Sequence, residues 1–191
     1  MSAAMSDWIP RHRITVDEYY RMSEVGILPP DARVELIEGE IIDMAPTGMD
    51  HGSIVLQLTH RLVRAVGDLA LVLPQSGVRL SDISEPQPDF TLLRPPVGTY
   101  RKKVPTAGDA LLVIEISDSN LRYDLKVKAP LYANHGVPEC WIIDVSGRQL
   151  RFFRAPKAGQ YSELGSTALS GLHVPVAVPD VQIDLTDLLD E

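Results

Sequence analysis

The alternation of hydrophobic and polar residues over the first forty-four positions predicts a helix followed by a hairpin. Thr15 and Glu18 have the spacing of a capping box, so we expect a helix to begin here. The stretch RVELIEGEIIDM contains two apolar runs separated by Glu38-Gly39. Because such a pair favours a tight turn, this stretch is predicted to form two paired strands.

Residues 51–69 carry apolar side chains at helical spacing. The predicted apolar face consists of Val55, Leu58, Leu62, Val66 and Leu69. Asp50 stands where an N-cap residue is expected. We therefore predict a long amphipathic helix, followed by a second hairpin within LALVLPQSGVRLSD.

The second half of the chain alternates predicted strands with a helix. PDFTLL is expected to be a short strand, and ALLVIEIS a strand buried on both faces. YDLKVKAPLYANHGV is predicted to be a helix that ends at Gly136, and ECWIIDVSGRQLRFF two strands that turn at Ser146-Gly147. The tail is expected to end in a short helix. Strands and helices therefore mix along the chain, and the helices can cover both faces of a sheet, which indicates an α/β (α+β) fold.

Pro130 is an unusual residue for the interior of the predicted helix. Proline lacks an N–H donor, and its ring clashes with the carbonyl four residues earlier, here that of Lys126. We predict a kink that directs Lys128 toward the sheet.

Composition and charge limit the classes of protein that the chain can belong to. With 191 residues and 45% hydrophobic residues, we expect one globular domain at 14–179, a tail at 1–13 and an acidic segment at 180–191. The net charge is −8, and five of the acids lie in that last segment. No stretch resembles a signal peptide or a membrane span, so we expect a cytoplasmic protein with no membrane role. Cys140, the single cysteine, is interpreted as a core thiol.

Glu115 is unusual because it interrupts the apolar strand LLVIEIS. A buried carboxylate is costly unless a partner compensates its charge, so it lies either at an exposed strand end or beside a cation. Asp89 opens the strand PDFTLL, and the two carboxylates meet if the strands are neighbours. Two adjacent carboxylates repel each other unless a divalent cation lies between them, and oxygen ligands of this kind suit Mg²⁺. Lys128 follows on the next helix, where its ammonium group can orient a water or offset charge on a phosphate.

This arrangement resembles the PD-(D/E)xK nuclease superfamily, which has a Pro-Asp on one strand and an acid-x-Lys on the next. QPDF and VIEIS match that motif, except that Ser117 occupies the place of the lysine. The same departure is found in the Uma family of restriction endonucleases, formerly a domain of unknown function, whose lysine lies on the following helix. The resemblance extends over most of residues 14–155 and includes the stretches VELIEGEIIDMAPTGMDH and RYDLKVKAPLYANHGVPECWIID. It implies a restriction-endonuclease-like mixed β-sheet flanked by helices, with an N-terminal helix and β-hairpin.

The resemblance also implies roles for individual residues. Asp89 and Glu115 correspond to the metal ligands, with Mg²⁺ (or Mn²⁺) as the ion, and Lys128 to the catalytic lysine. Lys126 is the other candidate for the catalytic lysine. The family spacing favours Lys128, because Lys128 lies four residues after Asp124 and four before Tyr132. Glu35 and His51 match two further positions that the family tends to keep, but the resemblance assigns them no role.

Each candidate has an ordinary structural explanation as well. A Pro-Asp pair is a common turn, and a helix lysine is usually a solvated charge. Glu35 can instead pair with Arg33 or a lysine across its hairpin, and His51 can pack or bond locally at the helix start. The functional interpretation rests on the residues occurring together and in order.

The expected function is Mg²⁺-dependent hydrolysis of DNA by an endonuclease, with a homodimer as the simplest way to cut both strands. The alternatives are a catalytically inactive nuclease-fold protein that acts in binding or assembly, and a hydrolase of another phosphodiester. Arg94, Arg101, Lys102 and Lys103 form a basic loop that either lines the site or merely balances acids. The helix at 51–66 and the strand containing Arg151-Phe152-Phe153 are candidates for a dimer interface, although core packing explains them equally well. No motif for sequence recognition is evident.

Overall fold

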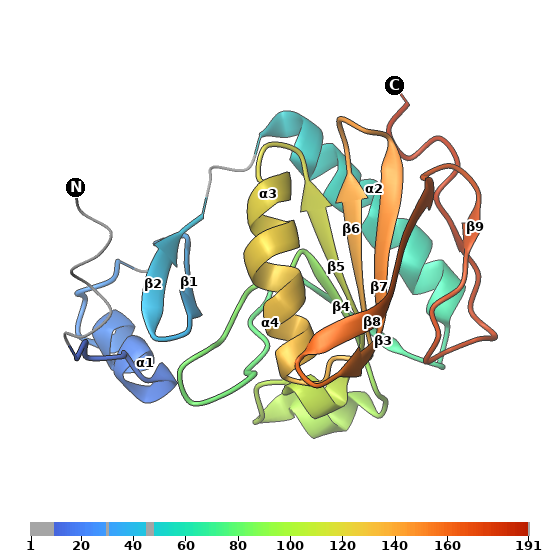
Figure 1. The fold of residues 1–191 in the computed structure, drawn as a ribbon. Helices are drawn as coiled ribbons and strands as arrows, with labels where there is room; N and C mark the ends of the chain where they lie inside the picture. Colours follow the sequence, from blue (N-terminus) through green and yellow to red (C-terminus); the bar gives the residue numbers. More distant parts are fainter. Residues whose placement is uncertain (1–9, 30, 45–47, 191) are drawn as a thin grey trace.

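A six-stranded mixed sheet forms the centre of the molecule (Figure 1). The computed structural model describes residues 10–29, 31–44 and 48–190. The strand order is β3-β4-β5-β6-β7-β8; only β5 and β6 are parallel, and the other neighbours are antiparallel. The strands are β3 (Leu71–Pro74), β4 (Phe90–Leu93), β5 (Ala110–Ser117), β6 (Glu139–Asp144), β7 (Gln149–Lys157) and β8 (Gln160–Ala168). The mixed sheet flanked by helices confirms the predicted fold class.

Helices cover both faces of this sheet (Figure 1). One face packs against α2 (Met49–Val66) and the segment with β9 (Leu172–His173) and β10 (Ile183–Asp184). The other face packs against one irregular helix made of α3 (Leu121–Tyr123), a π-helical turn called η3 (Asp124–Lys128) and α4 (Ala129–Asn134). Because side chains alternate along a strand, β5 directs Ile114 and Ile116 toward α2 and Glu115 toward α4.

An N-terminal unit lies beside the sheet and consists of α1 (Val16–Glu24) with the hairpin of β1 (Val34–Ile37) and β2 (Glu40–Asp43). The predicted capping box of Thr15 and Glu18 is present. Glu38 and Gly39 form the predicted turn, with φ of 50° and 74°. Leu36 packs toward α1. Glu35 therefore points to the opposite face of the strand.

The loop between β3 and β4 attaches this hairpin to the sheet. Leu36 forms a β-bridge with Glu85, and the Gly39 N–H donates to the Ile83 carbonyl at 2.7 Å. The same loop leads directly into β4 through Asp89. The position of Glu35 in the hairpin is thus tied to the position of Asp89 at the sheet.

Near Pro130, where a kink is predicted, the helix has a widened π-helical turn. The Ala129 N–H bonds the Asp124 carbonyl, five residues earlier, rather than the one four earlier. Proline excludes the regular pattern here because it has no N–H and its ring crowds the carbonyl of Lys126. The π-helical turn spans Asp124 to Lys128 and ends just before the proline.

Two predicted elements are wrong. Residues 69–82 do not form a hairpin, because β3 pairs with β4, which lies sixteen or more residues away in sequence. The loop between these two strands contacts the N-terminal hairpin instead. The tail forms strand β10 and turns rather than a helix. Its apolar residues, Val181, Ile183, Leu185 and Leu188, are buried in the main core, and such packing outweighs local helix preference.

The long helix also differs in detail from the prediction. It begins at Met49 with Gly48 as the N-cap residue, so Asp50 is in the first turn and caps nothing. Its buried face consists of Ile54, Leu58, Leu62 and Val66, with Val55 partly buried. Leu69 lies beyond the helix, which ends before Gly67, and is half exposed.

The predicted boundary at residue 179 stays a prediction. Residues 1–9 of the expected tail and Glu191 of the expected acidic segment lie outside the described residues, as do residues 45–47 of the stretch that carries the family resemblance. Among the described residues, no helix has both the length and the apolar character needed to cross a membrane.

Candidate active site

Strands β4 and β5 place Asp89 and Glu115 at the same end of the sheet. The antiparallel register pairs Thr91 with Val113 and Phe90 with Ile114, so the next position along brings Asp89 beside Glu115. Asp89 is held there because its Oδ2 accepts a hydrogen bond from the Ile116 N–H at 2.8 Å. Both carboxylates line one cavity of about 530 Å³.

Lys128 lies between two carboxylates in this cavity. Its Nζ is 3.1 Å from Glu115 Oε1 and 3.1 Å from Glu35 Oε2. All three residues are almost completely buried, with exposed fractions of 5% or less. Glu35 therefore pairs with the helix lysine.

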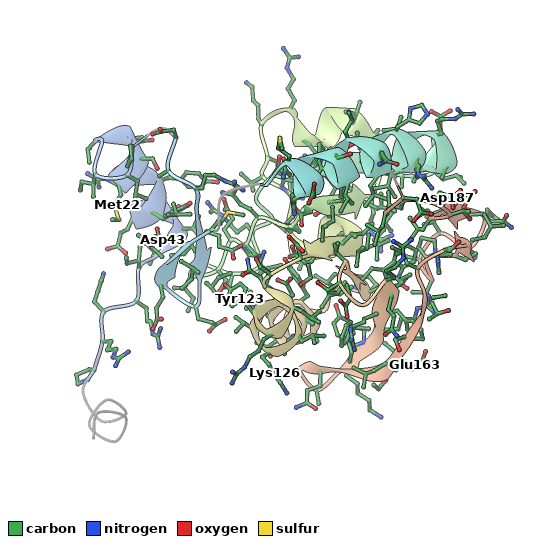
Figure 2. The ribbon with its side chains drawn as sticks, turned by 90° about the horizontal axis from the view of Figure 1, so that it is seen from above. Met22, Asp43, Tyr123, Lys126, Glu163 and Asp187 are labelled. Atoms are coloured by element: carbon green, nitrogen blue, oxygen red, sulfur yellow. The ribbon has the colours of Figure 1, made fainter. Side chains whose placement is uncertain are left out.

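The helix brings Asp124 and Tyr132 to the same site and leaves Lys126 outside it. The Tyr132 hydroxyl donates to Glu115 Oε1 at 2.6 Å, and Asp124 is buried and lines the cavity. Lys126 is exposed, and Figure 2 shows it on the outer side of the helix. Of the two candidate lysines, Lys128 alone contacts the carboxylates.

His51, in the first turn of α2, contacts the other carboxylate. Its Nε2 is 2.9 Å from Asp89 Oδ1. This hydrogen bond raises the pKa of His51, while burial opposes the shift. Asp89 is thus fixed by a helix on one side and by the backbone of β5 on the other.

Two contacts to Glu35 were not expected from the sequence. The Tyr123 hydroxyl donates to Glu35 Oε1 at 3.2 Å, and the Gln87 N–H donates to Glu35 Oε2 at 3.0 Å. The sequence signal that could have identified Tyr123 is its place directly before Asp124 in RYDLKVK, a stretch that carries the family resemblance. In a regular helix Tyr123 and Lys128 would lie on different faces, but the five-residue turn brings them to the same one.

The cavity has a strong excess of negative charge. Two fixed cations, Arg33 and Lys128, face six carboxylates: Glu35, Asp43, Asp89, Glu115, Asp118 and Asp124. Burial raises the pKa of Glu115 to about 8, although Lys128 acts in the opposite direction. Burial would lower the pKa of Lys128, but Glu115, Glu35 and Asp124 together raise it, so the lysine is charged.

The family model that matches the chain is described as "Uma2: Putative restriction endonuclease" and covers residues 16–186. This chain belongs to the Uma2 family. A search of curated proteins gives no match. Among solved structures, a crystal structure titled as a putative nuclease belonging to DUF820, from Anabaena variabilis, is similar with a TM-score of 0.70. Its sequence identity is 20%, and the match covers 92% of this chain and 97% of that one, which shows a shared fold.

In this Uma2 chain, Asp89 and Glu115 are chemically suited to a hard divalent cation. No cluster of three or more His, Cys, Asp or Glu side chains among the described residues forms a ready cage for a metal. Mg²⁺ does not need such a cage, because it is commonly bound by one or two carboxylates and retains several waters. The excess of carboxylates over cations in the cavity supports the same fit.

The basic loop does not line the site of this Uma2 chain. Strand β4 runs away from Asp89, so the loop that follows it, with η1 (Val97–Arg101) and η2 (Ala107–Asp109), lies at the opposite end of the sheet (Figure 1). Lys103 pairs with Asp109, and Arg94 bonds the Gly108 carbonyl. These contacts favour the alternative that the loop charges balance local acids.

Proposed function

We propose that this protein is a Mg²⁺-dependent endonuclease that hydrolyses phosphodiester bonds of DNA. The observation that carries the proposal is the meeting of Asp89, Glu115 and Lys128 in one cavity from two neighbouring strands and a helix. Membership of the Uma2 family supports a nucleic acid as the substrate.

Each residue has a distinct part in the proposed mechanism. Asp89 and Glu115 would hold the ion, with Mn²⁺ as an alternative to Mg²⁺. When bound, such an ion polarises a phosphate oxygen and lowers the pKa of a water. Lys128 orients the attacking water and stabilises negative charge that develops on the phosphate. The hydrogen bonds from His51 and Tyr132 fix the orientation of the two ligand carboxylates.

The charge of the cavity makes a cation necessary for substrate entry. A phosphate would face six carboxyl groups and two fixed cations, and Glu115 is the one whose raised pKa of about 8 keeps it protonated at neutral pH; the remaining acids still outnumber the cations, so the phosphate is repelled. A divalent ion at Asp89 and Glu115 offsets two of those negative charges. We therefore expect DNA to bind productively only after the metal.

A plasmid assay tests the proposal. Supercoiled DNA is incubated with the protein and Mg²⁺ or Mn²⁺, and nicked and linear products are quantified. Glu115→Gln and Lys128→Ala, each assayed where circular dichroism shows it to be folded, should reduce the cleavage rate by about 10²-fold or more, because each loses a group that acts in the reaction. Lys126→Ala, which changes an exposed lysine two positions away, should stay within about threefold of the original rate. Cleavage that persists in both active-site variants contradicts the proposal.

One observation favours a second function, a non-catalytic protein with a nuclease fold. Lys128 is neutralised by carboxylates on both sides, an arrangement that a purely structural ion network also produces. Metal binding distinguishes the two functions. Isothermal titration with Mn²⁺ should show one site that Glu115→Gln weakens, whereas no binding, together with no cleavage, supports the structural role.

A further inference from the structure

Helix α2 carries an exposed apolar stripe on the side away from the core. Met49, Leu56 and Val63 are 92%, 73% and 54% exposed, and each lies seven residues after the one before. Seven residues make nearly two helical turns, so the three side chains form one line about 21 Å long. The buried face, with Leu58 and Leu62, lies on the opposite side of the helix.

Charged residues beside the stripe are arranged asymmetrically along the helix. Asp50 lies near its beginning and Arg64 near its end, and both are exposed. Neither forms an ion pair with another described residue. A partner with the reverse order of charges would match this helix along its whole length.

We propose that α2 pairs with α2 of a second copy of this chain, antiparallel and about a twofold axis beside Leu56. In this register Leu56 contacts its own counterpart, and Met49 of each copy faces Val63 of the other. Asp50 of each copy then lies beside Arg64 of the other, which gives two equivalent ion pairs. Such self-complementarity is what a twofold interface requires.

The side chains next to the stripe permit close approach of the two helices. Gly52 lies beside it, and a Cβ placed there would meet nothing within 4 Å. Ser53 and His60, on the other flank, face each other across the same axis. A parallel arrangement would instead place Asp50 beside Asp50 and Arg64 beside Arg64, so repulsion opposes it.

Cysteine cross-linking tests both the pairing and its direction. Cys140 is buried, so one introduced cysteine provides the reactive thiol. With diamide as oxidant, Leu56→Cys should form a covalent dimer, because disulfides need Cα atoms within about 7 Å. Met49→Cys and Val63→Cys should each stay monomeric alone, since each is about 21 Å from its own counterpart, and should cross-link when mixed.

Each cross-linking outcome decides the proposal. If all three variants cross-link alone, the helices are parallel and the proposal is wrong. If Leu56→Cys stays monomeric at concentrations where the original chain sediments as a dimer, the dimer uses another surface. A monomer at every concentration also overturns the proposal.

Sedimentation velocity supplies an independent measurement. Leu56→Glu should raise the dissociation constant of the dimer at least tenfold, whereas Val25→Glu, at the exposed apolar residue that follows α1, should leave it unchanged. Asp50→Arg should weaken the dimer, and Asp50→Arg combined with Arg64→Asp should restore it. None of these outcomes depends on nuclease activity.

Discussion

Lys128 is the residue on which the site's electrostatics depend. It has two carboxylate partners from separate parts of the chain, Glu35 on the hairpin and Glu115 on β5. If a metal takes Glu115 as a ligand, Glu35 remains as a counter-ion for the lysine. The second carboxylate thus allows a buried ammonium group to stay charged and in place.

Removal of the lysine should strongly destabilise the fold. Lys128→Ala leaves Glu35 and Glu115 buried without their cation, and we expect a loss of about 3–5 kcal/mol in the free energy of unfolding. Lys126→Ala should change it by no more than about 0.5 kcal/mol, because that side chain is exposed. Urea denaturation followed by circular dichroism measures both. Equal effects would show that the pairs to Lys128 contribute nothing.

The hydroxyl of Tyr132 should affect metal affinity through Glu115. Tyr132→Phe keeps the buried ring and removes the donor to Glu115 Oε1, so the carboxylate loses its fixed orientation. We expect Mn²⁺ affinity to fall about 10-fold or more, as measured by isothermal titration. Tyr161→Phe is the control, because that buried hydroxyl bonds the Val137 carbonyl instead. An unchanged affinity in Tyr132→Phe contradicts the assigned role.

At the scale of elements, the hairpin that supplies Glu35 depends on its turn. Gly39 has a φ of 74°, and a Cβ there would lie 2.9 Å from the Arg13 Cα and 2.6 Å from its Cβ. Both the backbone conformation and the space therefore require glycine.

Gly39→Ala should destabilise the protein by about 2 kcal/mol. Gly52→Ala is the matched control, because it lies in a helix with open space around it and should add about 0.5–1 kcal/mol of stability. Thermal unfolding at low protein concentration compares the two. A stabilising effect of Gly39→Ala would mean that the turn is not constrained as described.

Local patterns predicted most elements because their signals lie within a few residues. The capping box, the Glu38-Gly39 turn and the apolar run of β5 needed no tertiary information. The pairing of β3 with β4 could not be predicted in this way, since nothing local specifies a partner beyond a long loop. The tail was misjudged for a similar reason, because burial against α2 determines its conformation.

The candidate site was predictable to the extent that it follows sequence motifs. Asp89, Glu115 and Lys128 were selected on motif and spacing, and the structure brings them together. Their catalytic and metal-binding roles stay predictions. Regular helical spacing does not predict the contact of Tyr123 with Glu35, because 3.6 residues per turn place Tyr123 and Lys128 on different faces. The π-helical turn that brings them to one face is not evident from that spacing.

At the scale of the whole molecule, the site has more acidic than basic side chains, while the basic loop lies at the far end of the sheet. DNA affinity should therefore depend on divalent ions. In EDTA we expect binding of a labelled duplex to weaken at least about tenfold relative to Ca²⁺, a hard cation that the same carboxylates can hold. Fluorescence anisotropy at fixed ionic strength measures this effect. Equal affinity in both conditions would place the DNA elsewhere on the surface.

The widened turn contains one residue more than a regular helix needs to connect Tyr123 to Lys128 on one face. Deletion of Lys126 would shorten the turn by one residue and permit ordinary helical hydrogen bonding up to the proline. Tyr123 and Lys128 would then be four residues apart, which is about 40° around a regular helix, so both could still face Glu35. The five-residue turn is thus one residue added to a helix whose two ends keep their mutual orientation.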